Sequence, residues 1–204
     1  MTFETVPVVH VVAGRFPEYP GADPERALTT LARRFGRVAL VDASGIQVNE
    51  PQVEFIQDAS RHRSLWVDAG PRYATDAMDV LVAGAETATL RWNTLRDAKE
   101  LEEAAELAQA GSLFVGLEYP KGRFLANPRD ARSADEVAQL AERLGVGLVF
   151  ILDDPEEPGL RALPPAQTAR WVQGIPRRLA AEAQEMGFQG ALLAPAELPP
   201  EESA

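Results

Sequence analysis

Two titratable residues occupy matching places in the chain, each four positions before a Gly-Arg-Phe triplet. His10 precedes the triplet 14–16, and Glu118 precedes the triplet 122–124. Both follow apolar runs of the kind that forms buried strands. An imidazole and a carboxylate that face each other can exchange protons with a substrate near neutral pH. We expect His10 and Glu118 to be the catalytic acid–base pair. The alternative is that His10 is a hydrogen-bonded core residue.

Five arginines end or closely follow apolar runs of this chain. Guanidinium groups that converge on one place bind phosphate or carboxylate through forked hydrogen bonds. The alternative is that each arginine pairs with a neighbouring acid and contributes little. Together with an Asp-Ala-Gly segment that would let backbone amides approach an anion, they form the predicted substrate-binding set: Arg15, Asp68, Gly70, Arg72, Arg91, Arg123 and Arg177.

Acidic residues also lie at the ends of the apolar runs, at Asp42, Asp68, Glu118 and Asp153. With His10 they offer the oxygen and nitrogen ligands that divalent ions use. Their spacing is dispersed and matches no metal-binding motif. We therefore expect no metal and no cofactor, with the acidic set kept as an alternative.

Composition excludes several classes of function. The 204 residues suffice for a single domain over 1–204. Lys and Arg number 20 against 31 Asp and Glu, a net charge of −11 without a basic run, which argues against binding to nucleic acid. The absence of cysteine excludes disulfides and thiolate sites. No apolar stretch is long enough for a membrane span. We expect a cytoplasmic protein that contacts no membrane.

Short apolar runs alternate with helical patterns along most of the chain, which is typical of βα units on a parallel sheet. Asp23-Pro24 and the capping box from Ser133 to Glu136 mark two helix starts, and Gly36 and Gly145 mark the matching helix ends. The predicted strands are Val6–Val12, Arg37–Asp42, Ser64–Asp68, Thr87–Arg91, Ser112–Leu117, Val146–Leu152, Arg170–Gln173 and Gln189–Leu193.

The chain also contains an internal repeat, with four segments of 1–110 recurring in the same order within 111–204. Segment 10–16 matches 118–124, 27–36 matches 136–145, 66–72 matches 171–177, and 83–85 matches 186–188. Four βα units duplicated once predict a small (β/α)8 TIM barrel built from two half-barrels. An open doubly wound sheet is the alternative, although the chain has no glycine-rich phosphate loop to support it.

Two units of this barrel depart from the regular pattern. The sixth is expected to be shortened, and the last helix to be missing, because only a Pro-rich acidic tail follows Leu193. His62, in an Arg-His-Arg loop before the third predicted strand, is expected to be solvated at the end opposite the active site.

Several segments resemble the histidine-biosynthesis barrels, the family of phosphoribosylformimino-aminoimidazole carboxamide ribotide isomerase and imidazole glycerol phosphate synthase. They are VPVVHVVAGR, LWVDAGPRYATDAMDVLVAGAE, GLEYPKGR and GFQGALLAPAEL. The resemblance implies a duplicated half-barrel and acid–base isomerisation of a phosphorylated aminoaldose. It also implies two aspartates at the places that His10 and Glu118 occupy here.

The phosphate sites of that family are only partly matched. Asp68-Ala69-Gly70 keeps one backbone loop, whereas Arg91-Trp92-Asn93, Gly174-Ile175-Pro176 and Ala194-Pro195 replace the glycine-rich ones. Proline donates no amide and tryptophan blocks a close approach. A substrate with two phosphates bound in the family's manner is therefore not expected.

Two functions follow from this pattern. The first is an isomerase-type enzyme that acts on a small phosphorylated or carboxylated metabolite. The alternative is a catalytically retired barrel that serves in binding or assembly; relatives of this kind also suggest one-carbon or pterin cofactor biosynthesis. A deep pocket that holds His10 and Glu118 would favour the enzyme, and a mouth filled by Tyr73, Trp92 and Tyr119 would favour the retired barrel.

We also expect a homodimer. Without a last helix, the seam between the first and last predicted helices should expose apolar side chains, and exposed apolar patches usually mark partner surfaces. The residues of this predicted patch are Leu28, Leu31, Phe35, Leu179 and Met186.

Overall fold

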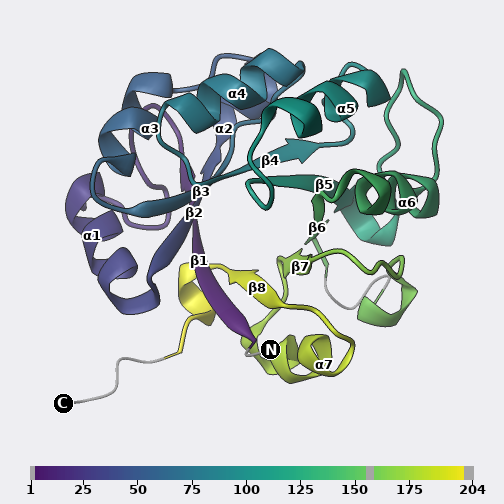
Figure 1. The fold of residues 1–204 in the computed structure, drawn as a ribbon. Coiled ribbons are helices and arrows are strands. Elements are labelled where there is room, and N and C mark those ends of the chain that lie inside the picture. The colour runs from purple at the N-terminus through teal and green to yellow at the C-terminus, as the bar shows by residue number, and fades with distance from the viewer. Residues whose placement is uncertain (1–2, 155–158, 200–204) are drawn as a thin grey trace.

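Eight parallel strands form a closed barrel in which each strand pairs with its neighbours in chain order and β8 pairs with β1. The computed structural model describes residues 3–154 and 159–199. Figure 1 shows the strands around the middle of the molecule and the helices outside them. The predicted α/β barrel is confirmed. Its strands are β1 (Glu4–Val11), β2 (Arg37–Asp42), β3 (Ser64–Asp68), β4 (Thr87–Arg91), β5 (Leu113–Tyr119), β6 (Gly147–Leu152), β7 (Arg170–Gln173) and β8 (Gly190–Leu193).

The helices connect successive strands and cover the outside of the barrel (Figure 1). The α-helices are α1 (Pro24–Phe35), α2 (Ala43–Val48), α3 (Val53–Ser60), α4 (Ala74–Val82), α5 (Ala98–Leu107), α6 (Ala134–Leu144) and α7 (Ala180–Glu185). The 3-10 helices are η1 (Pro120–Gly122), η2 (Leu160–Ala162), η3 (Arg177–Leu179) and η4 (Pro195–Glu197).

Local sequence explains where the longest helices begin and end. The Asp23 carboxylate accepts a hydrogen bond from the Arg26 amide, which caps α1 before its first-turn proline. Ser133 and Glu136 form the predicted capping box of α6, and Gly145 ends that helix with a left-handed φ of 68°. These short-range signals predict the helix boundaries because they involve only neighbours in the chain.

Large aromatic side chains fill the inside of the barrel. The Trp66 ring lies 4.4 Å from Phe114 and 5.0 Å from Trp171, centroid to centroid. Its indole nitrogen donates to the Thr89 hydroxyl at 2.7 Å. A second, larger core lies between the strands and the helices. Side chains alternate along a strand, and the inward positions nearer the carboxyl ends include polar His10, Glu118 and Gln173 beside apolar Ile151.

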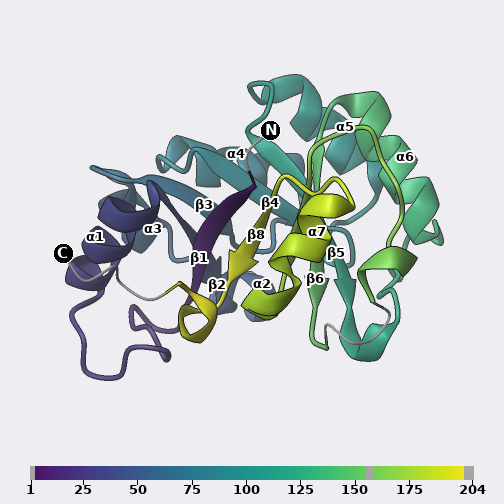
Figure 2. The same ribbon diagram turned by 90° about the horizontal axis from the view of Figure 1, so that it is seen from below.

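The connections after β6 and β8 differ from the others. Between β6 and β7 the described residues contain the 3-10 helix η2, and after β8 they contain η4. Figure 2 looks onto the side where β1 and β8 run together, with α7 next to β8. None of the helices in the described residues is long and apolar enough to cross a membrane.

The predicted exposure of the apolar seam is wrong for two of its five residues. Leu28 and Leu31 are buried within the chain, because this face of α1 points toward the barrel and packs into the outer core. Phe35 and Met186 are partly buried against the same core. Leu179 and Leu198 are partly buried against that core as well. The exposed patch from which a homodimer was expected is therefore not formed by these residues.

Candidate functional site

A cavity of about 410 Å³ opens at the carboxyl ends of the strands, where barrel active sites are built. It brings together residues from opposite sides of the barrel, since β1 and β5 are four strands apart in either direction. We call it the mouth cavity. Its principal lining residues are Val8, His10, Arg91, Glu118, Ile151, Asp153 and Gln173.

The alternation of side chains along β1 and β5 directs the two predicted catalytic residues inward. Val6 and Val8 belong to the cluster inside the barrel, and His10 follows at the same parity. Phe114 belongs to that cluster too, and Glu118 follows it by four positions. His10 and Glu118 therefore both line the mouth cavity, each one residue before the end of its strand.

Glu118 belongs to a buried charge network. Arg91 at the end of β4 donates from Nε to Oδ2 of Asp68 at 2.7 Å, and its Nη1 forms an ion pair with Oε1 of Glu118. The exposed fractions of the three side chains are only 11% for Arg91, 6% for Asp68 and 14% for Glu118. One guanidinium thus pairs with two carboxylates, which come from the neighbouring strands β3 and β5.

Gly116 makes room for this network. A methyl group at its Cα would lie 3.4 Å from Cγ of Arg91 and 3.1 Å from Cγ2 of Thr89. Arg91 is directly opposite Gly116 in the register of β4 and β5. The small residue therefore lets the arginine stem cross the mouth and reach the carboxylate two positions further along β5.

His10 has a separate carboxylate partner, Glu18, from the loop that follows β1. The Glu18 Oε1 atom contacts the His10 Nδ1 atom and also accepts a hydrogen bond from the His10 backbone amide at 3.1 Å. The side chains are 46% and 23% exposed, respectively. A carboxylate at Nδ1 fixes the proton of the neutral ring on that nitrogen, which leaves Nε2 as the proton acceptor.

Sequence reasoning missed Glu18 and also Gln173, which ends β7 and lines the mouth cavity. The position of Glu18 in the loop after the first predicted strand could have indicated its role, because such loops surround the mouth of a barrel. Glu18 Oε2 is buried and has no hydrogen-bond partner among the described residues. Glu18 is not itself among the residues that line the mouth cavity, so its role there is through the His10 ring.

Asp68 and Gly70 serve the local structure of this site. The Gly70 amide lies 3.3 Å from Asp68 Oδ1, and the φ of Gly70 is 62°. A Cβ at this position would lie 2.7 Å from the Cα of Ile46 in α2. Glycine is thus required here by close packing against α2, and its amide is directed to Asp68.

Asp42 has a role in the backbone. Its carboxylate accepts hydrogen bonds from the amides of Ser44, Gly45 and Gln52 and from the Gln52 side chain, at 2.6–3.2 Å. It therefore caps α2 with both oxygens occupied. Asp153 is exposed and lines the mouth cavity. In the described ranges 3–154 and 159–199, no group of three His, Asp or Glu residues is arranged to hold a metal ion.

The remaining predicted arginines do not join Arg91 in lining the mouth cavity. Arg15, Arg123 and Arg177 are exposed. Arg72 is half-buried and lines a different hollow, between the loops that follow β3 and β4. Of the five arginines, the structure brings only Arg91 together with the predicted acid–base pair.

The aromatic residues that would have closed the mouth lie elsewhere. Trp92 and Tyr119 are buried in the outer core, and Tyr73 is 40% exposed on the wall of the other hollow. The mouth cavity is therefore open to a ligand.

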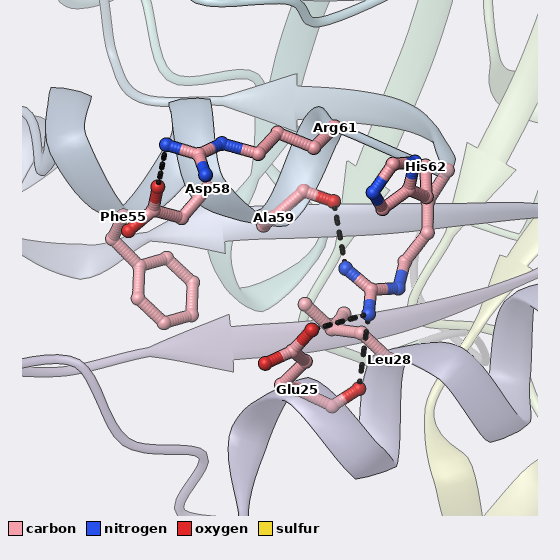
Figure 3. Close-up of a pocket in the computed structure, with 8 residues that line it drawn as sticks. Glu25, Leu28, Phe55, Asp58, Ala59, Arg61 and His62 are labelled. Carbon is pink, nitrogen blue, oxygen red and sulfur yellow. Dashed lines mark hydrogen bonds and ion pairs between the residues drawn. The ribbon is translucent and has the colours of Figure 1, made fainter.

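A further hollow of about 310 Å³ lies between α1 and α3 (Figure 3). Most of its charged groups form ion pairs with one another. Arg61 pairs with Asp58, and Arg63 contacts Glu25 and donates to the Ala59 carbonyl at 3.1 Å. His62 is exposed beside them in the loop before β3. This hollow offers a ligand less unpaired polar chemistry than the mouth cavity.

The fold and the mouth cavity together define an α/β-barrel protein with a polar site at the carboxyl ends of its strands. Comparison with known proteins finds no family model that matches the chain and no matching curated protein.

Proposed function

We propose that the protein is an isomerase-type enzyme that moves protons on a small metabolite bound in the mouth cavity. The observation that supports this most is the presence of His10 and Glu118 in one cavity of about 410 Å³. They come from opposite strands of the barrel, so they can address opposite ends of a bound substrate. An isomerisation needs two such groups, one to take a proton and one to return it.

His10 is the proton carrier in this proposal. Its Nδ1 is held by Glu18, so Nε2 takes a proton from the substrate, and Glu118 is the group that returns one. Glu18 is the positioning residue because it fixes the ring and the tautomer.

Glu118 is the second group. Arg91 contacts its Oε1, so Oε2 is the oxygen left for proton exchange with the substrate. Because Arg91 is bound to two carboxylates, a phosphate or carboxylate of the substrate must compete with Asp68 and Glu118 for it. We therefore place the hydroxyl- or amine-bearing part of the metabolite at the mouth and its anionic part toward the exposed arginines of the rim, Arg15, Arg123 and Arg177.

Deuterium exchange tests this proposal without knowledge of the final product. Sugar phosphates and amino sugars are incubated with the protein in D₂O, and incorporation at the carbon next to the carbonyl is followed by NMR. His10→Gln and Glu118→Gln should each slow incorporation by about 10²–10⁴-fold, the usual contribution of a positioned acid or base. Arg33→Gln, at an exposed position on α1, is the control. Incorporation that is absent for every candidate, or that is equal in all variants, would contradict the proposal.

One observation favours a second candidate, a retired barrel used in binding or assembly. The Asp68–Arg91–Glu118 network is complete without a ligand. If this network is only structural, ligands should bind at the mouth without any exchange of carbon-bound hydrogen.

We also infer that the barrel arose by duplication, as in the histidine-biosynthesis barrels that the sequence resembles. Backbone geometry supports this. Ala13 and Gly14 have φ values of 47° and 69°, and the matching residues Lys121 and Gly122 have φ values of 51° and 71°. Consecutive left-handed residues are rare outside specific turns, so their recurrence at matched positions favours a common origin of the two halves.

A further inference from the structure

We propose a second ligand site, which binds the phosphoryl group of a small molecule and is separate from the mouth cavity. It is a hollow of about 360 Å³ lined by Arg72, Tyr73, Thr94, Arg96 and Arg129. We call it the arginine hollow. None of its lining residues also lines the mouth cavity.

The three arginines come from three successive loops, those that follow β3, β4 and β5. The backbone ties the first two loops together, because the Arg96 amide donates to the Arg72 carbonyl at 2.9 Å. The convergence of these two arginines is therefore set by the fold.

Asn127 fixes the third loop in the same place. Its buried side-chain amide donates to the carbonyls of Trp92 and Leu95, both at 2.7 Å. Both of these residues belong to the loop after β4. Its carbonyl oxygen accepts from the Arg129 amide at 2.8 Å. One buried asparagine thus holds the backbone of Arg129 beside the other two loops.

The guanidinium groups of the arginine hollow have no carboxylate within ion-pair distance among the residues that the structure describes. This contrasts with Arg37, Arg63, Arg91 and Arg132, each of which pairs with an acid. The Nε atom of Arg72 is buried and lacks any hydrogen-bond partner in the same described set. Three arginines outside ion-pair distance of a described carboxylate, with an unused donor on one of them, favour the binding of an anion in this hollow.

Backbone amides contribute little to this site. The amides of Arg72 and Tyr73 donate to the Asp76 carboxylate at 3.0 and 3.1 Å, and the Ala74 amide donates to Glu100 at 2.9 Å. The start of α4 is therefore already capped. An anion would be held by the side chains, whose planar donors suit the oxygens of a phosphoryl group.

The charge and the shape of the hollow favour a phosphate ester of a small molecule. A phosphoryl group carries close to two negative charges at neutral pH, so it balances a cluster of arginines better than one carboxylate does. The Tyr73 ring is 40% exposed and lies 5.7 Å from the Arg96 guanidinium, centroid to carbon. It offers an apolar face to the organic part of the ester.

Calorimetric titration of the full chain with inorganic phosphate, glycerol 3-phosphate and acetate tests this site. Both phosphates should bind and acetate should bind more weakly. The double variant Arg96→Gln/Arg129→Gln should raise the Kd for phosphate by about tenfold or more, since charged hydrogen bonds are lost. Arg33→Gln, an exposed arginine on α1, is the matched control and should leave the Kd unchanged. A tighter Kd for the ester than for inorganic phosphate would identify an organic phosphate as the ligand.

The mouth cavity provides the second comparison. His10→Gln should slow deuterium exchange but leave phosphate affinity unchanged, so this site and the proposed function can fail separately. No phosphate binding at millimolar concentration would overturn the site. Equal binding by the double variant, or loss of binding in His10→Gln, would also overturn it.

Discussion

The loops after β1 and β5 share left-handed residues at matching positions but give their titratable residues different partners. His10 and Glu118 are each the penultimate residue of a strand, and left-handed pairs follow at 13–14 and 121–122. His10 pairs with Glu18 from its own loop, and the two side chains are 46% and 23% exposed. Glu118 pairs with Arg91 from the neighbouring strand, at 14% and 11% exposure.

This difference gives His10 and Glu118 different chemical environments at matching strand positions. A solvent-accessible imidazole with one partner can gain and lose a proton while its surroundings stay in place. The Glu118 carboxylate lies in a buried network and shares the Arg91 guanidinium with a second carboxylate, that of Asp68. The two matching positions therefore differ in exposure and in the charge of their partners, and not in their place on the strand.

The largest effect is expected when the buried network is broken. Arg91→Ala would leave Asp68 and Glu118 as unpaired, buried carboxylates, which should lower the free energy of unfolding by about 3–5 kcal/mol. Urea denaturation at neutral pH measures this. The control is Arg37→Ala, which removes a more exposed ion pair with Glu86 and should cost less than about 1 kcal/mol. Equal losses in the two variants would show that the buried network contributes no more to the free energy of unfolding than a surface ion pair.

Tyr119 on β5 makes the free energy of unfolding depend on pH, whereas its counterpart on β1, Val11, has no titratable group. Burial raises the pKa of Tyr119 above its ordinary value, and its hydroxyl has no hydrogen-bond partner in the described residues. A raised pKa in the folded state gives stability that is present below about pH 10, the unfolded value, and is lost as the pH rises beyond it.

Tyr119→Phe should therefore make stability less dependent on pH above about pH 10. It should also raise the free energy of unfolding at neutral pH by about 1 kcal/mol, because an unsatisfied buried hydroxyl is removed. Urea denaturation between neutral and alkaline pH tests both effects. Tyr73→Phe, at an exposed ring, should change neither. Destabilisation by Tyr119→Phe at neutral pH would reveal a partner for the hydroxyl.

The left-handed positions that the two loops share can be tested with one substitution in each. Ala13 and Lys121 have φ values of 47° and 51°, in a region that favours glycine. Ala13→Gly and Lys121→Gly should each stabilise the protein slightly, by about 0.5–1 kcal/mol, as relief of strain exceeds the entropy cost. Thermal or urea unfolding of both variants checks this. Stability changes of opposite sign would show that positions 13 and 121 do not carry the same backbone strain.

The smallest change in stability is expected for the His10 partner. Glu18→Ala removes a partly exposed pair and should cost less than about 1 kcal/mol. The tautomer of His10 should nevertheless change, because the proton is no longer held at Nδ1. Nitrogen NMR of the two histidines measures this, and the exposed His62 should be unaffected. An unchanged His10 tautomer would show that Glu18 does not position the ring.

The sequence by itself determined the barrel and the direction of its polar residues. Apolar runs separated by capped helices predict βα units, and the period of two in a strand places His10 and Glu118 inside once Val8 and Phe114 are inside. These signals are local, so they can be derived from neighbours in the chain. The bounds of β2, β3, β4 and β7 agree with the predicted segments for this reason.

Only the tertiary structure decided the partners. Glu18 reaches His10 because its loop folds back over β1, and Arg91 reaches Glu118 because the register of β4 and β5 places it opposite Gly116. Leu28 is buried because α1 turns that face to the barrel. Contacts of this kind depend on loop paths, strand register and helix orientation, which arise when the whole barrel closes and leave no period or motif in the sequence.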